Sequence, residues 1–239
     1  MRIDSETCIA CELCLPYCPM GAISMDDVAV IDQEECVDCG VCLRSGVCPS
    51  DCFIEEAAPW PRSLRATFSN PLTVHKETRI AGRGTEEMKT NEVTGRFKRG
   101  WAGLGVEFGR PGIGTRFRDV DKVAQALAKA GVEFEPMNPV TRLMVDQSTG
   151  KINDEVLNEK VLSAIIECRF PLEKAPAVLG ALKEAAKEID TVFSVDFINR
   201  VEPDDSVPAE RILTEIGIPP SINGKNNVGL GRPLAEGGD

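Results

Sequence analysis

The alternation of apolar and polar positions is sharpest in the second half of the chain. Apolar side chains occupy every second position along Trp101–Phe108, which predicts a strand with one buried face. Gly103 and Gly105 lie on the other face, where glycine permits close approach of a ligand or another backbone. Beyond this strand the apolar positions recur at helical spacing. We therefore expect a helix with Asp119 as its N-cap and Gly131 just past its end.

The same plan then repeats. The expected elements are a short strand at Val132–Glu135, a strand at Val161–Phe170, a helix at Glu173–Ile189 and a strand at Thr191–Val201. Apolar spacing from Val156 to Ile165 also fits a helix, and a short helix at Asp154–Lys160 reconciles the two patterns. The order β-α-β-β-α-β predicts an α+β fold, a split βαβ sandwich with two helices on one face of an antiparallel sheet. Cys168 is on the apolar face of its strand, which indicates a core residue and not a nucleophile.

The middle of the chain, residues 57–99, shows weak periodicity and predicts an irregular arm. Pro59 and Pro61 exclude a helix interior, and the segment is too long for an ordinary connection. It is a functional arm, an interface segment that orders on a partner, or a flexible linker, and its apolar residues argue against the last: Trp60, Phe68, Ile80 and Phe97. The only histidine, His75, is expected at the surface of this arm, where it would not act as a base.

The pattern divides the chain into four parts. A segment at residues 1–56 precedes the arm at 57–99, the sandwich covers 100–202, and residues 203–239 form a short helix starting near Pro208 and an extended tail.

Length and composition limit the class of protein. The chain has 239 residues, of which 42% are hydrophobic, and its net charge is −11. These values are typical of a globular protein with at least one core. No apolar run approaches the roughly 18 residues that span a bilayer, and no signal peptide pattern opens the sequence. A pI near 4.8 argues against nucleic acid as the main partner.

Cysteine is concentrated at the N-terminus, where nine of the ten residues fall in the first 52 positions. Disulfides, zinc and iron–sulfur clusters could each hold such a segment together. Disulfides need an oxidising compartment, and no export signal is visible in the sequence. Zinc sites use Cys pairs or His at wider spacing, and the only histidine lies outside the segment.

The spacing favours iron–sulfur chemistry. Cys8, Cys11, Cys14 and Cys18 form C-x2-C-x2-C-x3-C followed by proline, the bacterial iron–sulfur pattern. A second group repeats it with two extra residues around Arg44–Val47, which should bulge that loop: Cys36, Cys39, Cys42 and Cys48.

On these motifs, residues 1–56 resemble the bacterial dicluster ferredoxins. The resemblance implies two [4Fe-4S] clusters related by a pseudo-twofold axis. It implies that one cluster is bound by Cys8, Cys11, Cys14 and Cys48, and the other by Cys36, Cys39, Cys42 and Cys18. All eight implied ligands are cysteines, which favours electron transfer over catalysis at the clusters.

Cys52 is left over. In the repeat it aligns with Ala22, so it is either a small buried side chain near a cluster or a replacement ligand for Cys48. Pro49 follows Cys48 as Pro19 follows Cys18, which favours the first interpretation.

Charge falls into three blocks. Residues 1–56 carry a net charge of −10, residues 57–118 carry +7 and residues 119–239 carry −8. The glycine-rich loop Gly109–Asp119 links a predicted strand to a predicted helix within the basic block. It is a candidate site for an anionic small molecule or a partner, with these residues: Arg110, Gly112, Gly114, Thr115, Arg116 and Arg118. Alternatively, it is a basic loop packed against the acidic first block. It matches neither the dinucleotide nor the P-loop motif.

Three functions remain open. The first is a non-catalytic electron-transfer protein, the ferredoxin-like subunit of a larger cytoplasmic oxidoreductase, whose partner is a redox protein or catalytic subunit. The second is a redox-linked sensor that binds a ligand on the sandwich, which rests on analogy of fold alone. The third is an enzyme with a substrate at Gly109–Asp119, and no acid–base pair in the sequence supports it.

Overall fold

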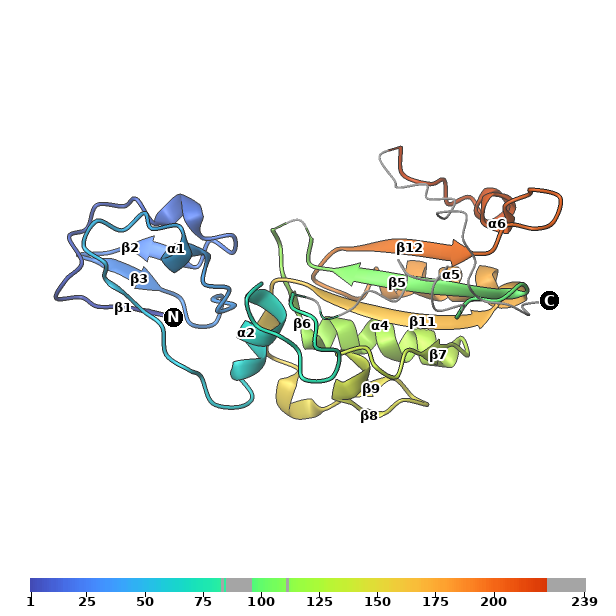
Figure 1. The fold of residues 1–239 in the computed structure, drawn as a ribbon, viewed down its shortest axis with the longest axis horizontal. Helices are drawn as coiled ribbons and strands as arrows, with labels where there is room; N and C mark the ends of the chain where they lie inside the picture. The colour runs from blue at the N-terminus through green and yellow to red at the C-terminus, as the bar shows by residue number, and fades with distance from the viewer. Residues whose placement is uncertain (83, 85–95, 111, 223–239) are drawn as a thin grey trace.

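The computed structural model describes residues 1–82, 84, 96–110 and 112–222. Helices and strands are both present, in agreement with the predicted α+β class. Part of the predicted arm (83 and 85–95) and the predicted tail (223–239) lie outside the described residues. Figure 1 shows a small N-terminal module on one side, a four-stranded sheet with its helices on the other, and helix α2 between them.

The N-terminal module is built from short elements that repeat. Its strands pair as two antiparallel ribbons, β1 with β4 and β2 with β3. The bounds are β1 Arg2–Ile3, β2 Ile23–Met25, β3 Ala29–Ile31, β4 Phe53–Ile54, a 3-10 turn at Leu15–Tyr17 and helix α1 at Val41–Arg44. A small core of apolar side chains, among them Ile23, Ile31 and Phe53, lies between the ribbons. We call residues 1–56 the cysteine module.

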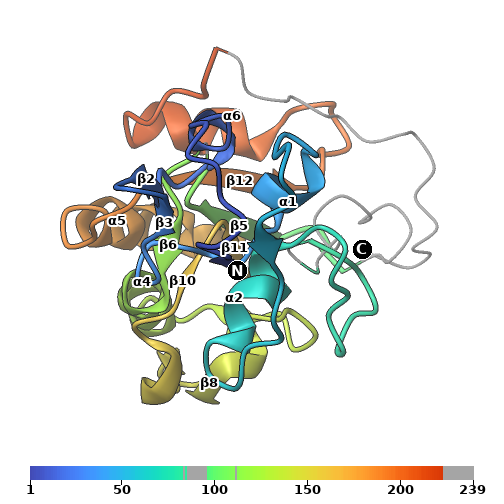
Figure 2. The ribbon, with the colours of Figure 1, turned by 90° about the vertical axis from the view of Figure 1, so that its left-hand side faces the viewer.

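The larger part of the chain is arranged around one antiparallel sheet with strand order β12-β5-β11-β7. Its strands are β5 Trp101–Phe108, β7 Glu133–Phe134, β11 Ala164–Pro171 and β12 Phe193–Asn199. Helix α4 (Phe117–Lys129) connects β5 to β7, and α5 (Ala175–Ala185) connects β11 to β12. Both helices lie on one side of the sheet (Figure 2). We call residues 101–199 the sheet region.

Smaller elements decorate the sheet region. They are β6 Thr115–Arg116 paired with β10 Lys160–Val161, the hairpin β8 Met144–Asp146 and β9 Lys151–Ile152, 3-10 turns at Thr141–Leu143, Asp154–Val156 and Leu172–Lys174, and α6 Pro208–Glu215. Helix α6 begins at the predicted Pro208 and contacts β12. No helix among the described residues is long and apolar enough to cross a bilayer.

The core lies between the sheet and α4 and α5. Alternate side chains of β5, including Leu104 and Val106, pack with Val123 and Leu127 of α4. Cys168 is buried in this core, as its position on the apolar face predicts, and burial raises the pKa of its thiol.

The glycine face of β5 receives a side chain of the same chain. A Cβ on Gly103 would lie 2.3 Å from the ring of Phe97. At Gly103 the close approach that the sequence predicts on this face is therefore made by an aromatic side chain from the end of the arm.

Several predicted boundaries are wrong. Helix α4 begins at Phe117, and Asp119 lies in its first turn instead of capping it. The backbone N–H groups of Phe117 and Arg118 donate to the carbonyls of Glu159 and Leu157, at 3.2 and 2.8 Å. These tertiary partners satisfy the first amides of the helix, so it starts three residues earlier than an N-cap at Asp119 predicts.

The second half of the sheet region also departs from prediction. The strand expected at Val161–Phe170 is interrupted, because the N–H of Leu162 donates to Ser69 Oγ at 2.8 Å instead of to a strand. The predicted helix at Asp154–Lys160 is only a 3-10 turn. Helix α5 ends at Ala185, so the expected helix to Ile189 is too long.

The described part of the arm contains more regular structure than its sequence predicts. It contains helix α2 (Ser63–Ser69), whose Leu64 and Phe68 join the core of the sheet region. The pattern misses this helix because it is short and has only these two fully buried apolar positions.

His75 is likewise buried, with only 1% of its surface exposed, so the predicted surface position is wrong. Its Nε2 lies 2.8 Å from the carbonyl oxygen of Gly82, and Phe68 contacts its ring edge-on at 4.8 Å between centroids. Only the neutral ring with a proton on Nε2 donates there without placing a charge in this apolar site.

The first prediction concerns acid stability. Burial lowers the pKa of His75 from its usual value of 6.5, so the folded protein binds its proton less readily than the unfolded chain does. The stability that this neutral ring supplies is complete above about pH 6.5 and declines as the pH falls below it. The free energy of unfolding of the wild type should therefore fall more between pH 7.5 and 5.5 than that of His75→Gln, which keeps a donor but does not titrate. Parallel pH profiles for the two proteins would contradict this assignment.

Candidate metal centre

The two halves of the cysteine module have the same backbone. Left-handed residues occur at matching positions: Ala10 and Glu12 in the first half correspond to Asp38 and Gly40 in the second. Gly21 and Asp51, three residues after Cys18 and Cys48, form a third matching pair. Non-glycine residues rarely adopt this conformation. Because it recurs at three paired sites, the two halves share the same backbone conformation there.

Hydrogen bonds to sulfur repeat in the same way. The N–H of Ala22 donates to Cys18 Sγ at 3.2 Å, and the N–H of Cys52 donates to Cys48 Sγ at 3.4 Å. In both halves the donor lies four residues after the last cysteine of the motif. Such amides stabilise a thiolate, which is the form of cysteine that binds metal.

The first group of thiols includes one from the end of the module. Burial raises the pKa of Cys14, and the charges of Cys11, Cys48 and Cys8 raise it further. The backbone amides of Ala29 and Ala10 lower the pKa of Cys8. The structure thus places Cys48 near Cys14 and Cys8 of the first motif.

The second group of thiols combines three cysteines of the second motif with the last cysteine of the first motif. Burial raises the pKa of Cys42 to about 11, and the charges of Cys39, Cys36 and Cys18 act in the same direction. A small, mainly apolar cavity is lined by the same four cysteines: Cys18, Cys36, Cys39 and Cys42. The fourth cysteine of each motif therefore crosses to the other half.

Cys52 lies beside the first group. Its sulfur is 3.4 Å from Cys48 Sγ, and burial together with this contact raises its pKa to about 12. Burial alone would raise the pKa of Cys48 as well, but the amide of Cys52 and the hydroxyl of Ser50 lower it to about 7. Of the two thiols, Cys48 therefore has the lower pKa.

The donor set suits a cluster better than a single ion. Among the described residues, no three His, Cys, Asp or Glu side chains converge closely enough to hold one metal ion. The ligands of a [4Fe-4S] cluster surround a body of eight atoms and need not converge on a point. Two groups of soft thiolates, with backbone N–H groups that donate to their sulfurs, match that requirement.

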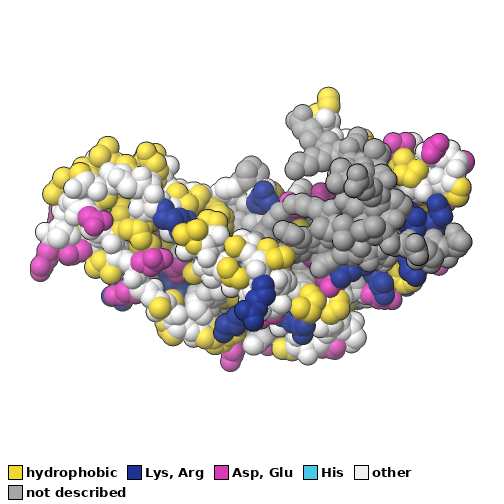
Figure 3. Space-filling view, in the orientation of Figure 1, with side chains coloured by type: hydrophobic (Ala, Val, Ile, Leu, Met, Phe, Trp, Pro, Cys, Tyr) yellow, Lys and Arg dark blue, Asp and Glu magenta, His cyan; other side chains and the backbone are white. Residues whose placement is uncertain are grey.

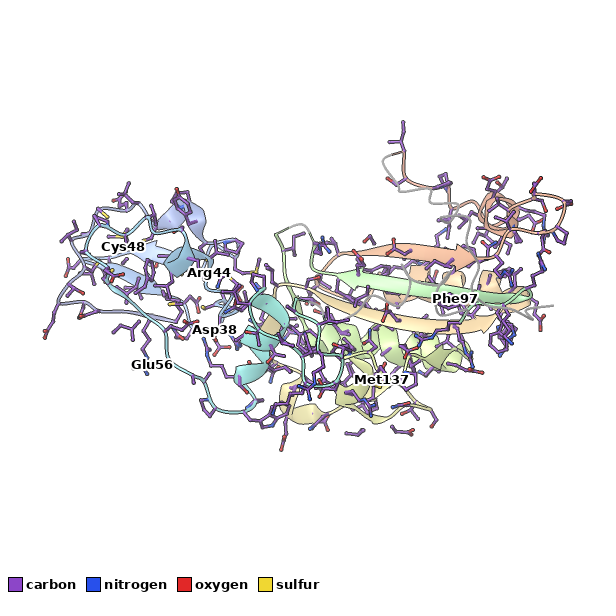
Figure 4. All side chains as sticks on the ribbon, viewed as in Figure 1. Asp38, Arg44, Cys48, Glu56, Phe97 and Met137 are labelled. Carbon is purple, nitrogen blue, oxygen red and sulfur yellow. The ribbon has the colours of Figure 1, made fainter. Side chains whose placement is uncertain are left out.

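The two-residue insertion changes the second half locally. It replaces the 3-10 turn at Leu15–Tyr17 with helix α1 and a left-handed Gly46. Arg44, within it, donates to the carbonyl of Cys39 at 2.6 Å and to Asn70 Oδ1 at 3.0 Å. Figure 4 shows Arg44 and Asp38 on the side of the module that faces α2, and Cys48 on the opposite side.

Comparison with known proteins agrees with this geometry. The family description "4Fe-4S binding domain" matches residues 1–24. Over 61 residues the chain is 44% identical to Ferredoxin-2 of Chlorobaculum tepidum, an alignment that covers 94% of that protein and 23% of this chain. The chain belongs to the ferredoxin family through its N-terminal module. The ferredoxin module, as we now call the cysteine module, is thus a [4Fe-4S] electron-transfer unit.

Proteins named as parts of larger assemblies carry related modules. Pyruvate synthase subunit PorD of Methanocaldococcus jannaschii is 39% identical over 49 residues, which is 55% of that protein and 20% of this chain. A component of an ion-translocating oxidoreductase complex of Methanosarcina acetivorans is 46% identical over 43 residues, which is 16% of that protein and 18% of this chain.

A buried arginine of the arm attaches the ferredoxin module to the sheet region. Arg65 of α2 is only 4% exposed. Its Nη1 donates to the carbonyls of Gln33, Glu34 and Cys36, at 2.8, 3.1 and 2.9 Å, and its Nε lies 2.5 Å from Glu159 Oε2. One guanidinium thus joins the module, the arm and the sheet region.

The glycine-rich loop contributes to the same interface. Arg116 Nη2 lies 2.9 Å from Glu35 Oε1, and Lys160 pairs with the other oxygen of that carboxylate. The hydrogen bond from Lys160 lowers the pKa of Glu35, and the charges of Lys160 and Arg116 lower it further. The backbone of Gly112 and Gly114 approaches Pro19 and Met20.

The anion-site hypothesis is not supported by these contacts. Arg110 pairs with Glu107 at 3.6 Å, Arg116 faces the module, and Arg118 is exposed. Thr115 is buried in the short strand β6. The arginines have separate surroundings instead of facing one ligand, and the contacts of Arg116 agree with the alternative of a basic loop packed on an acidic module.

The sequence does not reveal the role of Arg65. The sequence offers only a weak signal for this role. Arg65 lies between the two apolar positions of α2, in the basic block 57–118, whose charge is opposite to that of the module. Its partners are mostly backbone carbonyls. Every residue has a backbone carbonyl, so the amino-acid sequence does not indicate which ones Arg65 binds.

The second prediction tests this attachment. Arg65→Met should destabilise the protein by about 3–5 kcal/mol, because it leaves the carboxylate of Glu159 and three carbonyls without their donor. Arg65→Met combined with Glu159→Leu should recover part of the loss. Anaerobic denaturant unfolding measures both.

A matched control is Arg211→Met. Arg211 pairs with Glu215 at 3.1 Å on an exposed helix face, where an ion pair contributes about 0.5 kcal/mol or less. Equal destabilisation by the two arginine variants would rule out a special role for Arg65.

Proposed function

We propose that this protein is a non-catalytic electron-transfer subunit of a larger cytoplasmic oxidoreductase. In this proposal, residues 1–56 carry two [4Fe-4S] clusters, residues 57–99 form the connecting arm, residues 100–202 form a split βαβ domain and residues 203–239 a helix and tail. The observation that carries it is the repeated backbone of the ferredoxin module, with an amide donated to Cys18 and to Cys48 at equivalent positions.

The ligand assignment follows the two thiol groups. Cys8, Cys11, Cys14 and Cys48 hold one cluster, and Cys36, Cys39, Cys42 and Cys18 hold the other. When bound, such clusters accept and release single electrons. The chain's own residues hold the thiolates, donate amides to them and attach the second site to the sheet region through Arg65.

Two observations support a subunit over a free carrier, and a third bears on the compartment. The ferredoxin module contacts the arm and the sheet region through its Gln33–Asp38 segment, so it is attached to a larger part of the same chain. Related modules occur in proteins named as subunits of pyruvate synthase and of an ion-translocating oxidoreductase complex. Oxygen-sensitive clusters suit a reducing cytoplasm.

The third prediction concerns cluster number. Anaerobically purified protein should contain about eight irons and eight acid-labile sulfides per chain, as expected for two [4Fe-4S] clusters. About four of each would contradict the two-cluster proposal.

A pair of variants tests the ligand assignment. Cys48→Ala should lower the iron content by about half, because it removes the crossing ligand of one cluster. Cys52→Ala should keep the wild-type content, since Cys52 corresponds to Ala22, which lacks a thiol. Loss of iron only in the Cys52 variant would reverse the assignment.

A further inference from the structure

The two halves of the ferredoxin module differ in what covers them. Residues 33–41 form the covered loop, on which Arg65 donates to three carbonyls and Arg62 pairs with Asp38 at 3.2 Å. Within this loop Val37 is 1% exposed, and Cys39 and Gly40 are buried.

The matching residues of the first half, 5–13, form the open loop. Its backbone is held in the same way: the N–H groups of Glu6 and Glu34 each donate to the side chain of the preceding Asp4 or Asp32, at 3.0 and 2.8 Å. The N–H of Cys8 donates to the carbonyl of Asp4 at 3.0 Å, as that of Cys36 does to Asp32 at 2.9 Å.

The counterparts of the carbonyls bound by Arg65 are those of Ser5, Glu6 and Cys8. Within the described part of the chain, no donor reaches these three oxygens. Ile9, the counterpart of Val37, is 63% exposed, and Cys11, the counterpart of Cys39, is exposed as well.

The open loop combines an apolar centre with acidic neighbours. Ile9 and Leu13 are exposed, and Tyr17 is exposed just beyond them. Asp4, Glu6 and Glu12 supply negative charge around them. Figure 3 shows hydrophobic side chains over much of the upper surface of the module. An apolar patch with a charged rim is typical of protein interfaces, and this charge favours a basic partner.

We propose that the open loop is the docking surface for a basic electron-transfer protein. That partner places a cationic side chain against the carbonyls of Ser5, Glu6 and Cys8, as Arg65 does on the covered loop, and packs apolar groups on Ile9 and Leu13. This inference rests on the proposed function and assigns its partner surface.

Docking there brings the partner to the ligands of the first cluster site. Cys8 and Cys11 belong to the open loop itself, so an electron leaves or enters through residues in direct contact with the partner. The covered loop holds the second site on the side that faces α2 (Figure 4).

The fourth prediction uses ferric cytochrome c, a basic haem protein, as the probe. The full-length protein with its clusters is reduced anaerobically and mixed with it in a stopped-flow instrument. One electron passes from a reduced cluster to the ferric haem, and no atom is transferred. Glu6→Lys should slow the second-order reaction by about tenfold at low salt, since a reversed charge in the contact acts mainly on association. Ile9→Ser should slow it severalfold.

Matched controls change the same module elsewhere. Glu55→Lys alters the net charge of the module by the same amount, and Val30→Ser removes another exposed apolar side chain. Both should stay within about twofold of the wild-type rate, because they leave the open loop intact. Equal slowing by Glu55→Lys and Glu6→Lys would overturn the proposal.

A structural readout accompanies the rates. Carbodiimide, which joins a carboxylate to a lysine in contact with it, should link cytochrome c through Asp4, Glu6 or Glu12. Links confined to carboxylates of the sheet region would overturn the proposal.

Two further outcomes are distinguishable. If sedimentation shows a wild-type dimer that Ile9→Ser dissociates, a second copy of the chain occupies the patch and the proposal is wrong. If the wild type contains clusters but transfers no electron to cytochrome c, the docking surface is wrong while the cluster assignment stands. If it binds no iron, the proposed function itself fails.

Discussion

The buried guanidinium of Arg65 is the interaction on which the arrangement of this protein depends. A charge that is 4% exposed is stable only if carboxylate and carbonyl oxygens surround it. Those oxygens come from Glu159 and from residues 33, 34 and 36, which are far apart in the sequence. Satisfying one side chain therefore brings together the ferredoxin module, α2 and the sheet region. Arg116 and Lys160 reinforce the same contact through Glu35.

This attachment uses one half of a repeated structure and leaves the other half open. Both halves have left-handed residues, sulfur-bound amides and aspartate-held loops at matching positions. Only the second half carries the insertion with Arg44, and only its loop is covered by the rest of the chain that the structure describes. A symmetric module thereby acquires an inner and an outer side. In the proposed docking, the open loop meets the partner and the covered loop anchors the module.

The comparison of prediction with structure shows where sequence patterns lose their information. The β-α-β-β-α-β order is predictable, because strand and helix periodicities are strong where one face packs on a core. Helix α2 escapes prediction, since only Leu64 and Phe68 mark it. His75 is expected at the surface, yet Gly82 and Phe68 enclose it. The predicted N-terminus of α4 is wrong because carbonyls of Leu157 and Glu159 cap the helix, and a carbonyl carries no sequence signal.

The sequence by itself determined the chemistry of the cysteines. Their spacing places three cysteines of each motif in one local turn, and the repeat reveals the second motif. The exchange of Cys18 and Cys48 between the two groups is implied by the resemblance and not by the spacing. The tertiary structure decided everything that depends on residues distant in the chain. It placed Arg65 on the covered loop, directed Arg116 toward Glu35 instead of toward a ligand, and left Ile9 exposed where Val37 is buried. Equivalent residues in a repeat have the same local sequence signal, so only the packing of the rest of the chain makes them different.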